Sequence, residues 1–155
     1  MTVIPAIILS CAVGYIYTNY FKPVPKEYEF MRAESDICSV EYAIISFDED
    51  GNVSAQGFGF VNDTEGLKNE LKELDCYKGF PLDAIYNLRN GNTIPGFVIN
   101  YTDGSFEMIT PYFCVNSDLN ITKLEDILSA NVYCFNKDDI YNLIKKYSDS
   151  GNTNA

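Results

Sequence analysis

The first 21 residues constrain the fold of this chain more than any other stretch. From Thr2 to Phe21 the sequence contains no charged side chain, and its apolar part begins VIPAIILSC. A helix of roughly 20 residues is about 30 Å long, which matches the hydrocarbon core of a bilayer. The sequence therefore predicts a membrane-spanning anchor helix over residues 1–21, with these apolar side chains in the hydrocarbon: Val3, Ile4, Ile7, Ile8, Leu9, Val13 and Ile16.

Three other interpretations of this segment stay open. A cleaved signal peptide normally opens with lysine or arginine, which this chain lacks. The run Ile8–Cys11 resembles a bacterial lipobox, in which the cysteine is lipidated, although the chain stays apolar after Cys11. The segment can also be read as a buried core helix. A single-pass anchor explains the length and the missing charges best.

The side of the membrane on which the domain lies is predicted from the flanking charges. Lys22, Lys26 and Arg32 follow the apolar segment, and only the amino terminus precedes it. Because basic residues stay on the cytoplasmic side of a membrane, this pattern favours a cytoplasmic domain. The expected localisation is a single-pass membrane protein.

The charge of the chain limits its partners. The sequence has 22 Asp and Glu against 11 Lys and Arg, a net charge of −11. Phosphate binding requires a basic surface, so nucleic acid is excluded as a partner. The acidity indicates either an ordinary solvated surface or a field that attracts a basic partner. The absence of histidine removes the usual base for nucleophilic catalysis and the usual transition-metal ligand.

The remainder of the chain predicts an α+β domain, a small antiparallel sheet with helices packed on one face. The two prolines of KPVPK indicate a stiff spacer, so residues 22–35 are read as a linker. A single domain is expected over residues 36–147, followed by a disordered tail at 148–155. Strands are expected at 40–47, 53–61, 97–101, 106–110 and 131–135, and helices at 62–74, 121–128 and 138–147. Residues 75–96 are read as loop-rich.

Two local patterns support this assignment. Phe97, Ile99 and Tyr101 alternate with other residues before an Asp-Gly turn, as in a hairpin with one apolar face. Asn62 precedes a helical pattern with Glu65 three residues later, which predicts a capping box.

Four cysteines fall within the predicted domain, namely Cys38, Cys76, Cys114 and Cys134. They contain no C-x-x-C pair, so a zinc site is not expected. Outside the cytoplasm they could form two disulfides with three alternative connectivities, and inside it they would be buried small apolar residues. Both interpretations stay open.

Candidate acids for hydrolytic chemistry are Glu41, Asp48, Asp83, Glu107 and Asp118. With 22 acidic residues some pair lies close by chance, and no nucleophile or phosphate-binding motif accompanies them. We therefore predict no enzymatic activity, no cofactor and no metal.

The apolar N-terminal segment, the hairpin VINYTDGSFEMI and the final YNLIKKY helix resemble small membrane-attached or lipoprotein-like domains of unknown function from Gram-positive bacteria. The resemblance covers about the last 60 residues and implies a surface-associated accessory role on the extracytoplasmic side. The expected function is a membrane-tethered, non-enzymatic binding module with a protein partner. The alternative is an acidic inhibitor or immunity-type protein that caps a basic partner.

Overall fold

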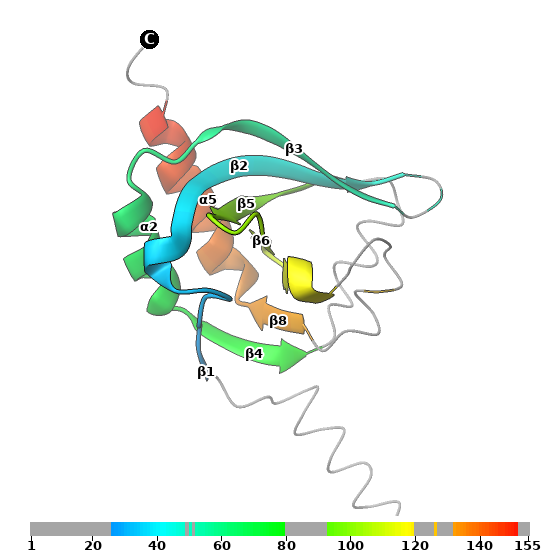
Figure 1. Ribbon diagram of the computed structural model, residues 1–155, viewed down its shortest axis with the longest axis horizontal. Helices are drawn as coiled ribbons and strands as arrows, with labels where there is room; N and C mark the ends of the chain where they lie inside the picture. The colour runs from blue at the N-terminus through cyan, green and yellow to red at the C-terminus, as the bar shows by residue number, and fades with distance from the viewer. Residues whose placement is uncertain are drawn as a thin grey trace, which may run out of the picture.

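A computed structural model shows an antiparallel sheet flanked by two helices (Figure 1). The structure describes residues 26–48, 50, 52–79, 93–119, 126 and 132–151. Within these residues the sheet has eight strands in the order β1-β4-β8-β7-β6-β5-β2-β3, and all neighbours are antiparallel. The strands are β1 (Lys26–Glu27), β2 (Ile37–Phe47), β3 (Val53–Phe60), β4 (Asp75–Gly79), β5 (Ile94–Tyr101), β6 (Phe106–Ile109), β7 (Cys114–Asn116) and β8 (Val132–Phe135).

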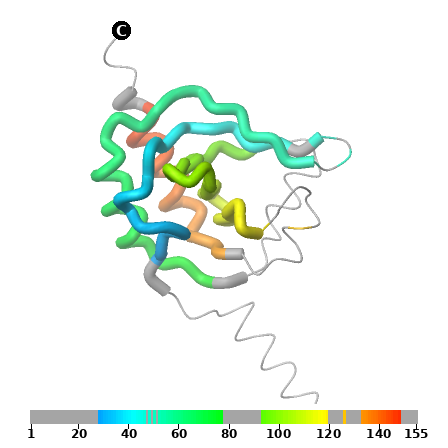
Figure 2. The backbone as a smooth tube through the Cα atoms, viewed as in Figure 1, coloured from blue at the N-terminus to red at the C-terminus, as the bar shows by residue number. Residues whose placement is uncertain are grey.

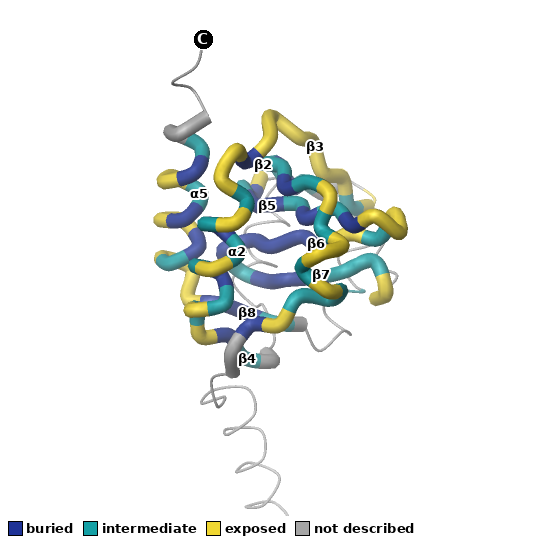
Figure 3. The backbone as a smooth tube through the Cα atoms, turned by 60° about the vertical axis from the view of Figure 1, so that its left-hand side comes forward, coloured by how far each residue is buried: buried dark blue, intermediate teal, exposed yellow. Residues whose placement is uncertain are grey.

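Two helices, α2 (Thr64–Lys72) and α5 (Lys137–Gly151), lie on the same face of the sheet (Figures 1 and 3). Both are amphipathic, and each turns one apolar stripe toward the sheet. Their buried side chains join Phe97 and Ile99 of β5 in one core cluster, to which they contribute Leu67, Leu71, Ile140, Leu143 and Tyr147. The prediction of an antiparallel sheet with helices on one face is confirmed in this respect.

A second core cluster lies on the opposite face of the sheet. Along β5, Phe97 and Ile99 belong to the helix-side cluster, whereas Ile94 and Val98 belong to the second one. Successive side chains of a strand point to opposite faces, so the sheet is apolar on both sides. The buried members of the second cluster are Ile45, Ile94, Met108, Phe113, Val115 and Cys134.

The hairpin predicted around Asp103-Gly104 is confirmed. Strands β5 and β6 pair in antiparallel register, from Phe97 opposite Ile109 to Asn100 opposite Phe106. Gly104 has a φ of 83°, which glycine adopts without steric cost. The side chain of Asp103 accepts a hydrogen bond from the backbone N–H of Ser105 at 2.8 Å, which closes the turn.

The other predicted elements show small differences. The β2–β3 hairpin and helix α2 form as predicted, but the helix cap is Asp63, which accepts from the N–H of Gly66 at 2.9 Å, rather than Asn62. Helix α5 continues to Gly151, four residues beyond the predicted end at Tyr147. Strand β4 lies in the region 75–96 that was predicted to be loop-rich. Residues 80–92 and the predicted helix at 121–128, except residue 126, lie outside the described residues.

The segment predicted as a linker is partly built into the fold. β1 pairs with β4 at one edge of the sheet, and Tyr28 is buried in the helix-side core. The chain then runs from this edge toward β2 near the other edge (Figure 2). We call residues 28–36 the crossing segment. It ends in a short 3-10 helix, η2 (Glu34–Asp36).

The predicted membrane-spanning helix needs correction. A bilayer-spanning helix needs about 20 mostly apolar residues, whereas α2 and α5 have 9 and 15 residues and carry charges. No helix among the described residues is long and apolar enough to cross a membrane. Among the described residues the fold is thus an antiparallel sheet with two helices and no such helix, and by the same finding the predicted single-pass membrane localisation is not supported. The anchor residues named above lie outside the described residues.

Candidate functional site

The most polar point of the core is a buried carboxylate, that of Glu107 on β6. Only 2% of this residue is exposed. Its Oε1 accepts a hydrogen bond from the backbone N–H of Met31 at 3.0 Å, and its Oε2 accepts one from the hydroxyl of Tyr101. Burying such a group is costly unless protein donors replace water, and here each oxygen has a donor.

The strand register explains why a glutamate lies in the core. Glu107 pairs with Ile99 across β5 and β6, so it shares the helix-side face with apolar neighbours. Met31 belongs to the crossing segment, which passes over this face. The carboxylate therefore connects the crossing segment to the β5–β6 hairpin.

Burial changes the acidity of the groups around Glu107. It raises the pKa of the Glu107 carboxyl, although the hydrogen bonds from Tyr101 and Met31 act in the opposite direction. Burial also raises the pKa of Tyr28 and Cys114, whose hydroxyl oxygen and sulfur lie 3.7 Å apart. The Cys114 thiol therefore keeps its proton at neutral pH, and a protonated thiol is a poor nucleophile. The cluster has the character of a structural network.

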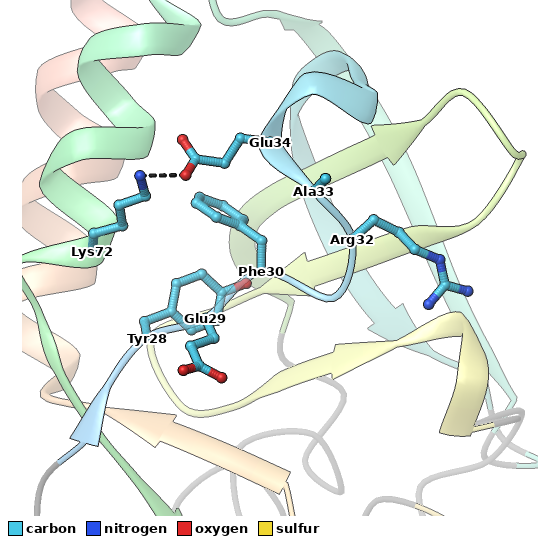
Figure 4. Close-up of a pocket in the computed structure, with 7 residues that line it drawn as sticks. All are labelled: Tyr28, Glu29, Phe30, Arg32, Ala33, Glu34 and Lys72. Atoms are coloured by element: carbon cyan, nitrogen blue, oxygen red, sulfur yellow. Dashed lines mark ion pairs between the residues drawn. The ribbon is translucent and has the colours of Figure 1, made fainter.

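A shallow pocket of about 340 Å³ adjoins the crossing segment (Figure 4). Across it, Lys72 of α2 forms an ion pair with Glu34, so these two charges already neutralise each other. Its lining residues are Tyr28, Glu29, Phe30, Arg32, Ala33, Glu34 and Lys72. No converging set of polar groups, as a specific small-molecule site requires, is formed by these residues.

Arg32 clamps the crossing segment to two acidic residues. Its Nε lies 3.0 Å from Asp103, and its two terminal nitrogens each lie 3.1 Å from an oxygen of Asp118. Hydrogen bonds from Ser105, and then from Arg32, lower the pKa of Asp103 to about 2. Asp118 is thus half of a bidentate pair with arginine, a geometry that fixes orientation.

The candidate acids predicted for hydrolytic chemistry have separate partners. Glu41 accepts from the side-chain amide of Asn100 at 2.9 Å, and Asp48 accepts from the backbone and side chain of Asn52. Asp118 binds Arg32, Glu107 is buried as described, and Asp83 lies outside the described residues. The structure does not bring the four described acids together at one solvent-accessible point.

The four predicted cysteines differ in their surroundings. Cys38 is exposed, whereas Cys76, Cys114 and Cys134 are buried on β4, β7 and β8, and the structure holds all four as thiols. Cys76 and Cys114 belong to the helix-side core and Cys134 to the other face. Among the described residues no group of three or more cysteines and acids is placed to hold a metal ion.

Among the described residues, the most accessible apolar surface is the edge strand β3. The sequence predicted a strand here but not that this strand lies at the edge of the sheet. β3 is the last strand of the sheet, and seven of its eight residues are exposed (Figure 3). Phe58 and Phe60 are each 64% exposed. An uncharged edge strand of this length, without proline, is open to pairing with a further strand.

The hydrogen-bond pattern shows which β3 backbone groups point outward. Asp48 donates its N–H to the carbonyl of Asn52, and the next pair along the ladder is Phe47 opposite Val53. This makes Phe47–Val53 a pair without mutual hydrogen bonds, and such pairs alternate with bonded ones. Ala55, two residues on, therefore turns its N–H and C=O away from β2. At the other end of β3, the N–H of Val61 donates to the carbonyl of Val40. By the same alternation, Phe60, opposite Glu41, turns its N–H and C=O away from β2.

A sequence signal for this edge exists in the run Gly57-Phe58-Gly59-Phe60. An ideal Cβ on Gly57 would lie 2.7 Å from a carboxylate oxygen of Glu41, so this glycine gives the Glu41 side chain room beside β3. Gly59 has open space instead. Glycine inside a strand often marks a β-bulge, and the register of β2 and β3 shifts here: Tyr42 lies opposite Gly59 and Ala43 opposite Gly57, so Phe58 is the extra residue.

No protein-family model matches the chain, and no curated protein or solved structure matches it either. The resemblance to lipoprotein-like domains therefore stays a prediction, and no functional residue is transferred to this chain.

Proposed function

We propose that this protein is a non-enzymatic binding module that adds a strand of a partner protein to its sheet at β3. The observation that carries the proposal is the exposed, uncharged edge of eight residues with two exposed phenylalanines. In strand addition, main-chain hydrogen bonds give affinity, and contacts to alternate side chains give specificity.

The two phenylalanines supply the apolar part of the binding energy. Covering a phenylalanine side chain contributes roughly 1.5–3 kcal/mol, and every 1.4 kcal/mol is about tenfold in affinity. Phe58 and Phe60 together are therefore sufficient to turn a weak backbone pairing into a measurable complex. The outward backbone groups of Ala55 and Phe60 supply its hydrogen bonds.

The occupant is a segment of a different protein rather than a second copy. Each copy carries a net charge of −11, so two copies repel each other. A partner without this excess of acidic residues is not repelled in this way.

A displayed library of random twelve-residue peptides, selected on the full chain, tests the proposal. We expect enriched peptides that form strands and that slow amide hydrogen exchange in β3 when bound. The double variant Phe58→Ser/Phe60→Ser removes the two exposed aromatic side chains. The variant Ala55→Pro removes the outward N–H of residue 55, which donates no hydrogen bond to β2. Both variants should lose at least tenfold in affinity for the enriched peptides.

The matched control is Leu119→Ser, which removes another exposed apolar side chain, 42% exposed, away from β3. It should bind the peptides like the wild type. Circular dichroism and thermal unfolding establish that each variant is folded. No enrichment, or peptides that bind all three variants equally, would overturn the proposal.

The second candidate function is an acidic inhibitor that caps a basic partner, which the net charge of −11 favours. The two functions differ in which variants matter. Capping by charge alone would be insensitive to the loss of Phe58 and Phe60, and it would weaken strongly with salt.

A further inference from the structure

We infer that the segment that pairs with β3 is uncharged in its centre and basic at both ends. This inference rests on the proposed function and specifies its partner. It comes from the charged residues that flank the strand at its two ends. Backbone pairing with β3 does not itself require these charges.

Both ends of β3 are acidic. Before the strand lie Asp48 and Asp50, and after it lie Asp63 and Glu65, all four in exposed positions. The strand between them, VSAQGFGF, has no charged residue, and no lysine or arginine occurs from Asp48 to Asp63. Strand β2, its neighbour, also has no basic residue, and the carboxylate of its one acidic residue, Glu41, accepts a hydrogen bond from the side-chain amide of Asn100.

Two of these residues have contacts that bear on how much negative charge remains. Asp63 accepts a hydrogen bond from the backbone N–H of Gly66, a neutral group that does not cancel its charge. Glu65 forms an ion pair with Lys68 at 2.5 Å, but the same lysine also lies 3.9 Å from Glu34. The end of β3 at Asp63 and Glu65 therefore keeps an excess of negative charge.

The two ends act as separate recognition points. Eight residues of antiparallel strand span about 27 Å, whereas the Debye length at physiological salt is about 8 Å. Each end of an incoming strand is thus attracted or repelled almost independently of the other. A strand with basic residues at both ends is attracted at each end, whether it pairs parallel or antiparallel to β3.

The same arrangement opposes self-pairing. If the β3 strands of two copies paired antiparallel, Asp50 of each would lie near Glu65 of the other, so acid would face acid at both ends. Parallel pairing would also match acid with acid. Edge strands commonly carry charge that prevents such association, and here the charge lies beside the strand.

The test uses the central sequence of a peptide enriched on β3, synthesised with two lysines, two glutamines or two glutamates at each end. Fluorescence anisotropy measures binding to the full chain at low and at high salt. We expect the lysine-ended peptide to bind at least tenfold tighter than the glutamate-ended one at low salt, with the glutamine-ended peptide between them. High salt should reduce the difference in affinity between the lysine-ended and the glutamate-ended peptide.

The variant Asp50→Asn/Glu65→Gln should reduce the preference for lysine ends by several-fold, while Glu73→Gln/Asp75→Asn, with the same charge change away from β3, should not. Equal binding of all three peptides would overturn this inference and leave strand addition at β3 intact. Failure to enrich any peptide would instead remove the proposed function. A wild-type dimer in sedimentation velocity that Ala55→Pro abolishes would identify a second copy as the occupant and overturn the inference.

Discussion

The hydroxyl of Tyr101 donates a hydrogen bond to the carboxylate of Glu107 inside the β5–β6 hairpin, and both residues are buried. The other carboxylate oxygen accepts a hydrogen bond from the backbone N–H of Met31. Replacing Glu107 by alanine leaves two donors without an acceptor, the buried hydroxyl of Tyr101 and the partly buried N–H of Met31. Since each costs about 1–3 kcal/mol, we expect Glu107→Ala to lower the unfolding free energy by roughly 2–4 kcal/mol in urea denaturation.

Glu73→Ala is the matched control, because Glu73 is an exposed glutamate at the end of α2. Its effect should stay within about 0.5 kcal/mol. If Glu107→Ala cost no more than this control, the carboxylate would not hold the crossing segment in place.

The stability of the protein should depend on the protonation of Glu107. Burial raises its pKa above the ordinary 4.5, so between these two values the folded protein binds more protons than the unfolded one. The stabilisation is therefore fully present below pH 4.5 and is lost as the pH rises through the folded pKa. Relative to Glu107→Gln, which does not titrate, the wild type should lose stability as the pH rises.

Urea denaturation of both proteins across the acid-to-neutral range measures this difference. Asp103, with its pKa lowered to about 2, acts with the opposite sign, because its stabilisation is lost as the pH falls. Asp103 is present in both proteins and cancels in the comparison. A wild-type stability that stays constant or increases with pH, relative to that of Glu107→Gln, would contradict a raised pKa for Glu107.

Two glycines of the sheet, Gly96 and Gly59, should differ in how replacement by alanine changes the stability of the protein. A Cβ on Gly96 would lie 2.5 Å from the backbone oxygen of Ile109 and 3.1 Å from Cδ1 of Ile45. Because backbone cannot move cheaply, Gly96→Ala should cost about 1–3 kcal/mol. Gly59 has nothing within 4 Å, so Gly59→Ala should be neutral or stabilise by up to about 1 kcal/mol. Thermal unfolding of both variants is the measurement, and equal effects would contradict the packing around Gly96.

Local sequence patterns predicted those elements whose determinants are local. The alternation of Phe97, Ile99 and Tyr101 and the Asp-Gly turn predicted the β5–β6 hairpin, and a stripe including Ile140 and Leu143 predicted α5. β3 was also predicted as a strand. These signals depend on neighbours in the chain, which a reader of the sequence sees directly.

The rest depends on the order of strands, which the sequence does not display. β3 lies at the edge because β2 pairs on its other side with β5, which is distant in the sequence, from Ile37 opposite Tyr101 to Ile45 opposite Ile94. Glu107 was considered only as a candidate catalytic acid, because its burial depends on Met31 from the crossing segment. The N-terminal apolar run was interpreted by composition alone.

The cysteines should divide by reactivity according to their place in the fold. Cys38 is exposed, whereas Cys114 and Cys134 are buried, and burial raises the pKa of Cys134 to about 12. Since the thiolate is the reactive form, iodoacetamide should label Cys38 in the native protein and leave Cys114 and Cys134 unmodified until denaturant is added. Peptide mass mapping assigns each label. Rapid native labelling of Cys114 would contradict the closed β6–β7–β8 core, and a Cys38 that stays unlabelled until a reductant is added would indicate that it forms a disulfide.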